Sequence, residues 1–71
     1  MSTYTHPAYG KLAWFYTDQK LPLQVLQSAN GYYIGTSVNN EPVSRESEYF
    51  PSRPDAETAM RNGIWTQRVT P

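Results

Sequence analysis

The sequence predicts an α+β fold, in which a three- to four-stranded antiparallel sheet of β-β-β-α order carries one short helix on one face. Three observations support this fold class. Strand-like segments fill the first two thirds of the chain, an Asn-Gly pair at 30–31 separates two of them, and a run with helix-capping residues follows at 53–62. Strands followed by a helix are typical of small α+β domains.

The chain has 71 residues, which is enough for one domain. Residues 1–10 combine Pro, Gly, Ser and Thr with isolated tyrosines, so we expect an irregular lead-in and assign the domain to residues 11–71. The aromatic segment 12–17 favours a strand. The segment 21–27 alternates apolar and polar residues and predicts another strand, with Pro22 at its first residue or on an edge.

The pair Asn30-Gly31 predicts a type I′ turn, since both residues tolerate a positive φ. This turn pairs Gln27 with Ile34 in the following strand, residues 32–36. Successive side chains then alternate between the two faces of the sheet. One face is expected to carry Val25, Tyr32 and Ile34, and the other Leu26, Ser28 and Tyr33.

A second turn is expected at Asn39-Asn40, followed by a third strand at 43–49. A two-residue turn there places Arg45 opposite Ile34. Arg45 then either grips an anion or pairs with an acidic residue of the helix, Asp55 or Glu57. Ser44 and Glu46 fall on one face of this strand, where we expect a polar surface exposed to solvent.

The helix is predicted at 53–62 because Ser52 is a suitable N-cap, Asp55 and Glu57 lie in the first turn, and Gly63 is placed for a C-terminal cap. An apolar stripe on this helix comprises Ala56, Ala59 and Met60. Residues 64–69 are expected to form a final strand or an extended tail.

Composition excludes some functional classes and weakens others. Lys plus Arg equals Asp plus Glu, six of each, which counts against DNA or RNA as the main partner. The absence of cysteine removes disulfides and thiolate metal sites, and His6 has no ligand near it in sequence, so we expect no metal and no cofactor. No apolar run could span a bilayer and no secretory signal is visible, so we expect a cytoplasmic protein without a membrane partner.

No nucleotide-binding, nucleophile-elbow or metalloprotease motif is present, so we expect a protein that is not an enzyme. Aromatic residues make up 14% of the chain, which suits either a small core or a contact surface. We therefore expect a protein-interaction module that self-associates through a sheet edge. The residues expected at the contact surface are Trp14, Tyr16, Tyr32, Tyr33, Arg45, Trp65 and Arg68. The alternative is a nucleic-acid-binding domain that stacks bases on sheet-face aromatics beside arginines.

Three short motifs add a resemblance: Ala29-Asn30-Gly31, then Ser47-Glu48-Tyr49, then Ser52-Arg53 with Ala56 and Ala59. Over roughly residues 24–63 they resemble the small bacterial YegP-like domains of unknown function, although this chain has a longer insert at 37–42. The resemblance implies a three-stranded sheet with a helix packed on it, often paired through strand edges into a dimer. It implies no established activity and no catalytic residues.

Overall fold

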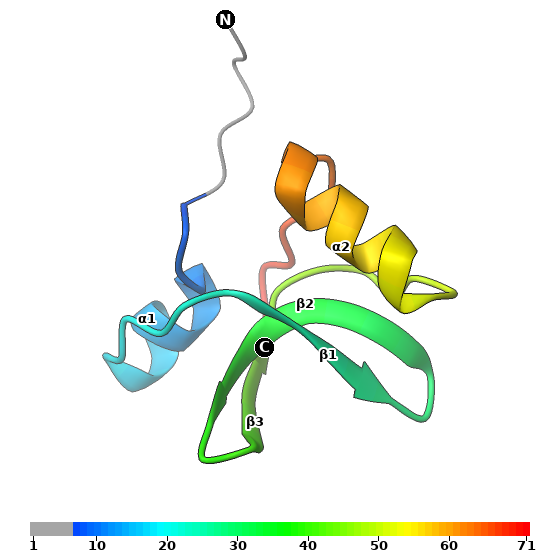
Figure 1. Cartoon of the computed structure of the whole chain (residues 1–71). Helices are drawn as coiled ribbons and strands as arrows, with labels where there is room; N and C mark the ends of the chain where they lie inside the picture. The colour runs from blue at the N-terminus through cyan, green and yellow to red at the C-terminus, as the bar shows by residue number, and fades with distance from the viewer. Residues whose placement is uncertain (1–6) are drawn as a thin grey trace, which may run out of the picture.

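Three antiparallel strands in the order β1-β2-β3 form the sheet of this fold, as the sequence predicts. The computed structural model describes residues 7–71, so His6 and most of the lead-in lie outside the described residues. Along the chain the elements are α1 (Lys11–Thr17), β1 (Gln24–Ser28), β2 (Gly31–Val38), β3 (Glu41–Arg45) and α2 (Arg53–Asn62). Figure 1 shows the curved sheet with α2 above β1 and β2 and with α1 at the opposite end.

The helix α1 corrects the prediction of a strand at residues 12–17. Aromatic residues favour strands because they fit a half-buried sheet surface, and this preference yields when tertiary contacts offer another solution. Here the helical form buries Leu12 and Ala13 and leaves the large rings outside. Asp18 ends the helix in the left-handed conformation, and its N–H donates to the Trp14 carbonyl at 2.9 Å.

The first hairpin turns one position earlier than predicted, at Ala29 and Asn30, and Gly31 takes the positive φ of 131°. Val25 therefore lies opposite Ile34, two residues from the predicted register. A shift of two residues leaves every side chain on its predicted face, because side chains alternate with a period of two. The predicted division of the hairpin into two faces is thus retained.

The second hairpin turns at Asn39 and Asn40 as predicted, and both residues have the positive φ that this turn requires. An extra residue, Val43, then interrupts the pairing, so Ser44 lies opposite Thr36. This bulge places Arg45 opposite Gly35, and the prediction that Arg45 shares the face of Ile34 is wrong. The strand also ends at Arg45 instead of continuing to residue 49.

The helix α2 has the predicted bounds, Arg53–Asn62. The Ser52 hydroxyl accepts a hydrogen bond from the Asp55 N–H at 3.2 Å, and Gly63 ends the helix at a φ of 67°. The predicted apolar stripe faces inward. The core beneath α2 contains Ile34, Ala59 and Trp65, with Leu23, Phe50 and Met60 packed against them.

The two ends of the described chain lie against the body of the fold. Residues 64–71 form neither helix nor strand, so they correspond to the expected extended tail, and the Arg68 N–H donates to the Glu46 carbonyl at 2.7 Å. Before α1, the Gly10 N–H donates to the Leu21 carbonyl at 2.9 Å.

Both helices lie on one side of the sheet. Ile34 beneath α2 and Thr36 beside the start of α1 are two residues apart on β2, which puts them on the same face. The other face carries Tyr33 and Arg45, and none of the described helices covers it (Figure 1). No helix in the described part of the chain is long and apolar enough to cross a membrane.

Candidate functional site

A fully buried carboxylate, that of Glu46, holds the N-terminus of α1. It accepts hydrogen bonds from the N–H groups of Leu12 at 3.0 Å and Ala13 at 3.1 Å. It also accepts from the Ser44 hydroxyl at 2.6 Å and the Gln67 side-chain amide at 2.7 Å. The first N–H groups of a helix have no partner within the helix, and a carboxylate also suits the positive end of the helix dipole. Glu46 therefore replaces the capping side chain that Gly10 lacks.

Ser44 and Glu46 belong to this buried network, and the expectation that they form a solvent-exposed polar face is wrong. Ser44 is 5% exposed and Glu46 is 0% exposed. The Ser44 hydroxyl also lies 2.7 Å from the Thr36 hydroxyl. The bulge at Val43 explains the difference, because it turns both side chains toward the helices. Their role in the structure is to position α1.

Gly10 allows the chain to approach this network closely. A Cβ atom at this position would lie 2.5 Å from Thr36 Cγ2 and 2.6 Å from Glu46 Oε2. Both distances are shorter than van der Waals contact. Glycine is thus required here by space, and α1 starts directly against the carboxylate that caps it.

Three consecutive aromatic side chains of α1 are exposed. Trp14 is 42% exposed, Phe15 is 80% exposed and Tyr16 is 52% exposed. Single exposed apolar residues are common on protein surfaces, whereas a contiguous aromatic patch is typical of a contact surface. We call Trp14, Phe15, Tyr16 and the neighbouring Tyr9 the α1 aromatic face.

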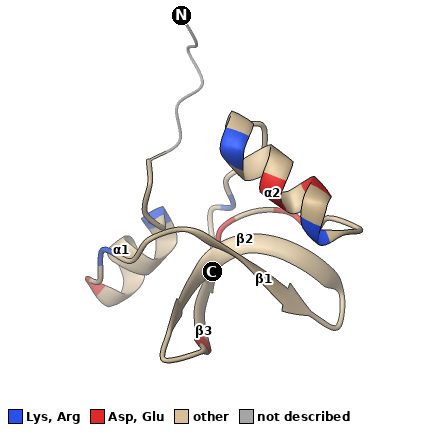
Figure 2. Ribbon diagram, in the orientation of Figure 1, with Lys and Arg blue, Asp and Glu red and all other residues tan. Residues whose placement is uncertain are grey.

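A lysine from the loop after α1 is held against this face. The Lys20 ammonium lies 4.8 Å from the Tyr9 ring centroid and 4.9 Å from that of Trp14. The two rings meet edge to face, with centroids 5.0 Å apart. A groove of about 420 Å³ runs beside them, lined by Tyr9, Lys11, Trp14 and Phe15. Figure 2 shows basic residues at both ends of the α1 region and an acidic residue, Asp18, at the C-terminal end of α1.

A second aromatic cluster lies on the helix-free face of the sheet. The Arg45 guanidinium lies 4.1 Å from the Tyr49 ring centroid and donates to the Ser47 carbonyl at 2.9 Å. Tyr33 meets Tyr49 edge to face, with centroids 5.9 Å apart. Tyr33 is only 5% exposed, so its ring is covered on this face of the sheet.

The two tyrosines of this cluster have opposite pKa shifts. Side-chain hydrogen bonds with Asn30 and Ser28, followed by the charges of Arg45 and Arg68, lower the pKa of Tyr49. Burial raises the pKa of Tyr33, and the neighbouring Tyr49 adds to this effect. Tyr49 therefore ionises at a lower pH than Tyr33.

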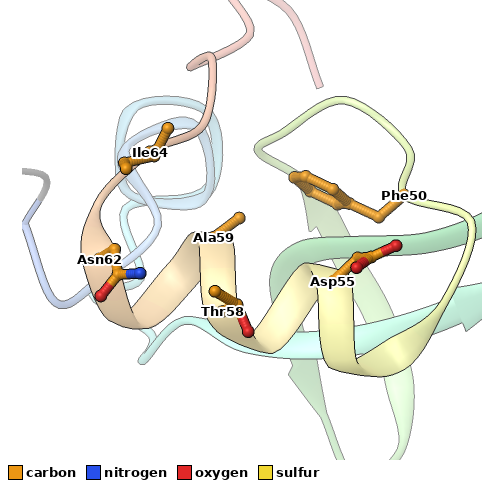
Figure 3. Close-up of a pocket in the computed structure, with 6 residues that line it drawn as sticks. All are labelled: Phe50, Asp55, Thr58, Ala59, Asn62 and Ile64. Carbon is orange, nitrogen blue, oxygen red and sulfur yellow. The ribbon is translucent and has the colours of Figure 1, made fainter.

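A smaller pocket of about 340 Å³ lies beside α2, and Figure 3 shows the six side chains that line it. They are Phe50, Asp55, Thr58, Ala59, Asn62 and Ile64. Phe50 and Ala59 also belong to the core packing under α2. The pocket is therefore the outer margin of that core.

The residues expected at the contact surface are divided among different parts of the molecule. Trp14 and Tyr16 lie on the α1 aromatic face. Tyr33 and Arg45 surround Tyr49, whose pKa also responds to Arg68. Tyr32 lies on the opposite face from Tyr33, with the Arg53 guanidinium 5.4 Å from its ring centroid. Trp65 is 8% exposed and packs in the core.

Sequence reasoning missed Tyr9, Phe15, Lys20 and Tyr49. The signal for Phe15 was present in the run Trp14-Phe15-Tyr16, because a helix of this length cannot bury three consecutive rings on one side. Tyr9 and Lys20 join this face only through the fold, so no local pattern could have found them.

Within residues 7–71, no group of three or more His, Cys, Asp or Glu side chains is placed to hold a metal ion. Comparisons with protein-family models, curated proteins and solved structures gave no match for this chain. The resemblance to YegP-like domains stays an expectation.

Proposed function

We propose that this chain is a non-catalytic protein-interaction module that contacts its partner through the α1 aromatic face. The observation that carries the proposal is the exposure of three consecutive aromatic side chains on α1, with Phe15 at 80%. Large rings contribute most of the binding energy at protein interfaces, since they lose little conformational freedom and bury a large area.

The anchoring of α1 supports the same proposal. An isolated helix of seven residues is not stable in water, so α1 needs the contacts that Glu46 provides. A helix held at its base by a buried network presents its side chains in a fixed arrangement. Such preorganisation lowers the entropy cost of binding.

The alternative of nucleic-acid binding by the sheet face has less geometric support. Tyr32 and Tyr33 lie on opposite faces, so one platform does not contain both rings. Tyr33 is also 5% exposed and offers little surface to a base. Stacking of successive bases requires exposed rings on one side.

Self-association through a sheet edge, which we retain as part of the proposal, is better suited to β1 than to β3. The edge strand β3 contains Pro42, the charged Glu41 and the bulge at Val43, all of which disfavour pairing with another strand. The strand β1, Gln24–Ser28, contains neither proline nor charge. Antiparallel pairing of two β1 strands therefore meets no like-charge repulsion.

The proposal is tested by site-specific photo-crosslinking. A photoreactive phenylalanine analogue replaces Tyr16 on the α1 aromatic face or, as a control, Val69 in the tail, which is more exposed than Tyr16. We expect a discrete crosslinked product from position 16 alone, identified by mass spectrometry, and its loss in the Phe15→Ser variant. Crosslinking that is equal at both positions, or insensitive to Phe15→Ser, would overturn the proposal.

Sedimentation equilibrium on the purified chain then identifies the kind of partner. A mass that rises with concentration to that of a dimer indicates a second copy, whereas a constant monomer mass together with a specific crosslink indicates a different protein. A dimer that persists in Phe15→Ser would assign self-association to another surface, such as β1.

A further inference from the structure

We propose that the groove beside α1 binds an acidic, apolar segment of the partner protein. An apolar side chain of that segment packs against Trp14 and Phe15, and a neighbouring carboxylate meets the Lys20 ammonium. This inference rests on the proposed function and adds the chemistry of the partner to it.

The lining of the groove carries a positive charge although the chain as a whole is neutral, with six basic and six acidic residues. The exposed Asp18 ends α1 two residues from Lys20 and is not part of this lining. Of the four described residues that line the groove, Lys11 is the charged one. Lys20 adds a second cation at the rings of Tyr9 and Trp14. The Glu46 carboxylate beneath α1 is fully buried and occupied by N–H and hydroxyl donors, so it offers no acceptor to a partner.

The position of Lys20 suits it to a carboxylate. Its ammonium is attracted to two ring faces at nearly equal distances, and the side chain is exposed to water on its other side. A free surface lysine must lose much of its side-chain freedom to bind an anion, whereas a lysine already held by two rings loses less. The N–H groups turned away from the rings remain available as donors.

The groove also suits an apolar side chain. Its volume of about 420 Å³ falls within the range of small ligand sites, about 300–1,000 Å³. Phe15 and Trp14 present apolar surface beside it at 80% and 42% exposure. A basic segment would place its charge near two lysines, and this repulsion disfavours it.

Three sets of synthetic peptides of equal length test the inference on the full chain. In the first set Leu and Phe alternate with Asp or Glu, in the second with Asn or Gln, and in the third with Lys. Binding is followed by NMR through the indole N–H signal of Trp14. We expect the acidic peptides to bind about three- to tenfold more tightly than their amide counterparts, with the difference reduced at high ionic strength.

The variant Lys20→Gln is the direct test of the ammonium. We expect it to remove most of the preference for acidic over amide peptides, measured as the ratio of the two affinities in the same variant. Arg61→Gln is the matched control, because it removes one charge from an exposed position on α2 and leaves α1 intact. This control should retain the preference.

The combined results distinguish failure of the acidic specificity from failure of the proposed function. Equal binding of acidic and amide peptides at Trp14 would overturn the acidic specificity while leaving the interaction module standing. Peptides that fail to bind, together with a specific crosslink at position 16, would overturn the short acidic segment as the ligand. Failure of both experiments would remove the proposed function itself. Tighter binding of a single-stranded oligonucleotide than of any peptide at Trp14 would assign the groove to nucleic acid instead.

Discussion

The two helices of this fold are stabilised at their N-termini in opposite ways. The helix α2 has its cap next to it in sequence, since the Ser52 hydroxyl accepts from Asp55 three residues later. The helix α1 has at its N-cap position Gly10, which has no side chain, and takes its cap from Glu46, 34 residues from Leu12 along the chain. The first helix therefore depends on the sheet being formed, whereas the second is encoded locally.

This difference explains where sequence reasoning succeeded. The residues that end α2 are all adjacent to it, so its bounds could be predicted from Ser52 and Gly63. The acceptor for α1 lies beyond both hairpins, and no window of sequence around residue 12 contains it. The aromatic composition then favoured the wrong element, a strand.

Among the variants that test this comparison, Glu46→Ala is expected to have the largest effect on the free energy of unfolding. It leaves the N–H groups of Leu12 and Ala13 without their buried acceptor, and we expect a loss of about 3–5 kcal/mol in the free energy of unfolding. Chemical denaturation followed by circular dichroism measures it. Because so small a chain is only marginally stable, Glu46→Gln serves as a milder variant. Undiminished amide-exchange protection of α1 in either variant would contradict the capping role.

The next largest effect is expected from Gly10→Ala. The added methyl group overlaps Thr36 Cγ2 and Glu46 Oε2, so we expect a loss of about 1–3 kcal/mol in the free energy of unfolding. Thermal or chemical denaturation provides the measurement. Combining it with Thr36→Ser, which removes the overlapping methyl, should restore part of the loss. A neutral Gly10→Ala variant would show that α1 has room to move away from β2.

A smaller and local effect is expected from Ser52→Ala. Loss of one capping hydrogen bond costs about 1 kcal/mol. Amide exchange should become faster in the first turn of α2 with no selective change in α1. Ser52→Asp retains a side-chain acceptor and is the control. A loss of protection in α1 as large as that in α2 would show that the two helices are not independent.

The smallest effect is expected from Phe15→Ser. Its ring is 80% exposed, so we expect the free energy of unfolding to change by no more than about 0.5 kcal/mol. Equilibrium denaturation checks this. The result matters because the same variant should abolish crosslinking at the α1 aromatic face. A large destabilisation would mean that the ring serves the fold.

In the sheet, the alternation of side chains predicted the faces of some residues correctly and of others wrongly. The faces of Val25, Ile34 and Tyr33 were predicted correctly despite an error in register, because that error was two residues. The face of Arg45 was predicted wrongly because a bulge adds one residue to β3, and no residue type in this segment predicts such a bulge. The candidate site was partly visible in Trp14 and Tyr16, whereas Lys20 reaches it only in three dimensions.

The inserted residue Val43 has a consequence for the sign of the charge beneath α1. With it, Ser44 and Glu46 alternate onto the helix side of the sheet and Arg45 onto the other. If Val43 instead paired with Thr36 in a regular ladder, these positions would be exchanged, and the Arg45 guanidinium would then face the N–H groups of Leu12 and Ala13, which repel a cation. The one-residue bulge in β3 thus decides whether a carboxylate or a cation lies at the N-terminus of α1.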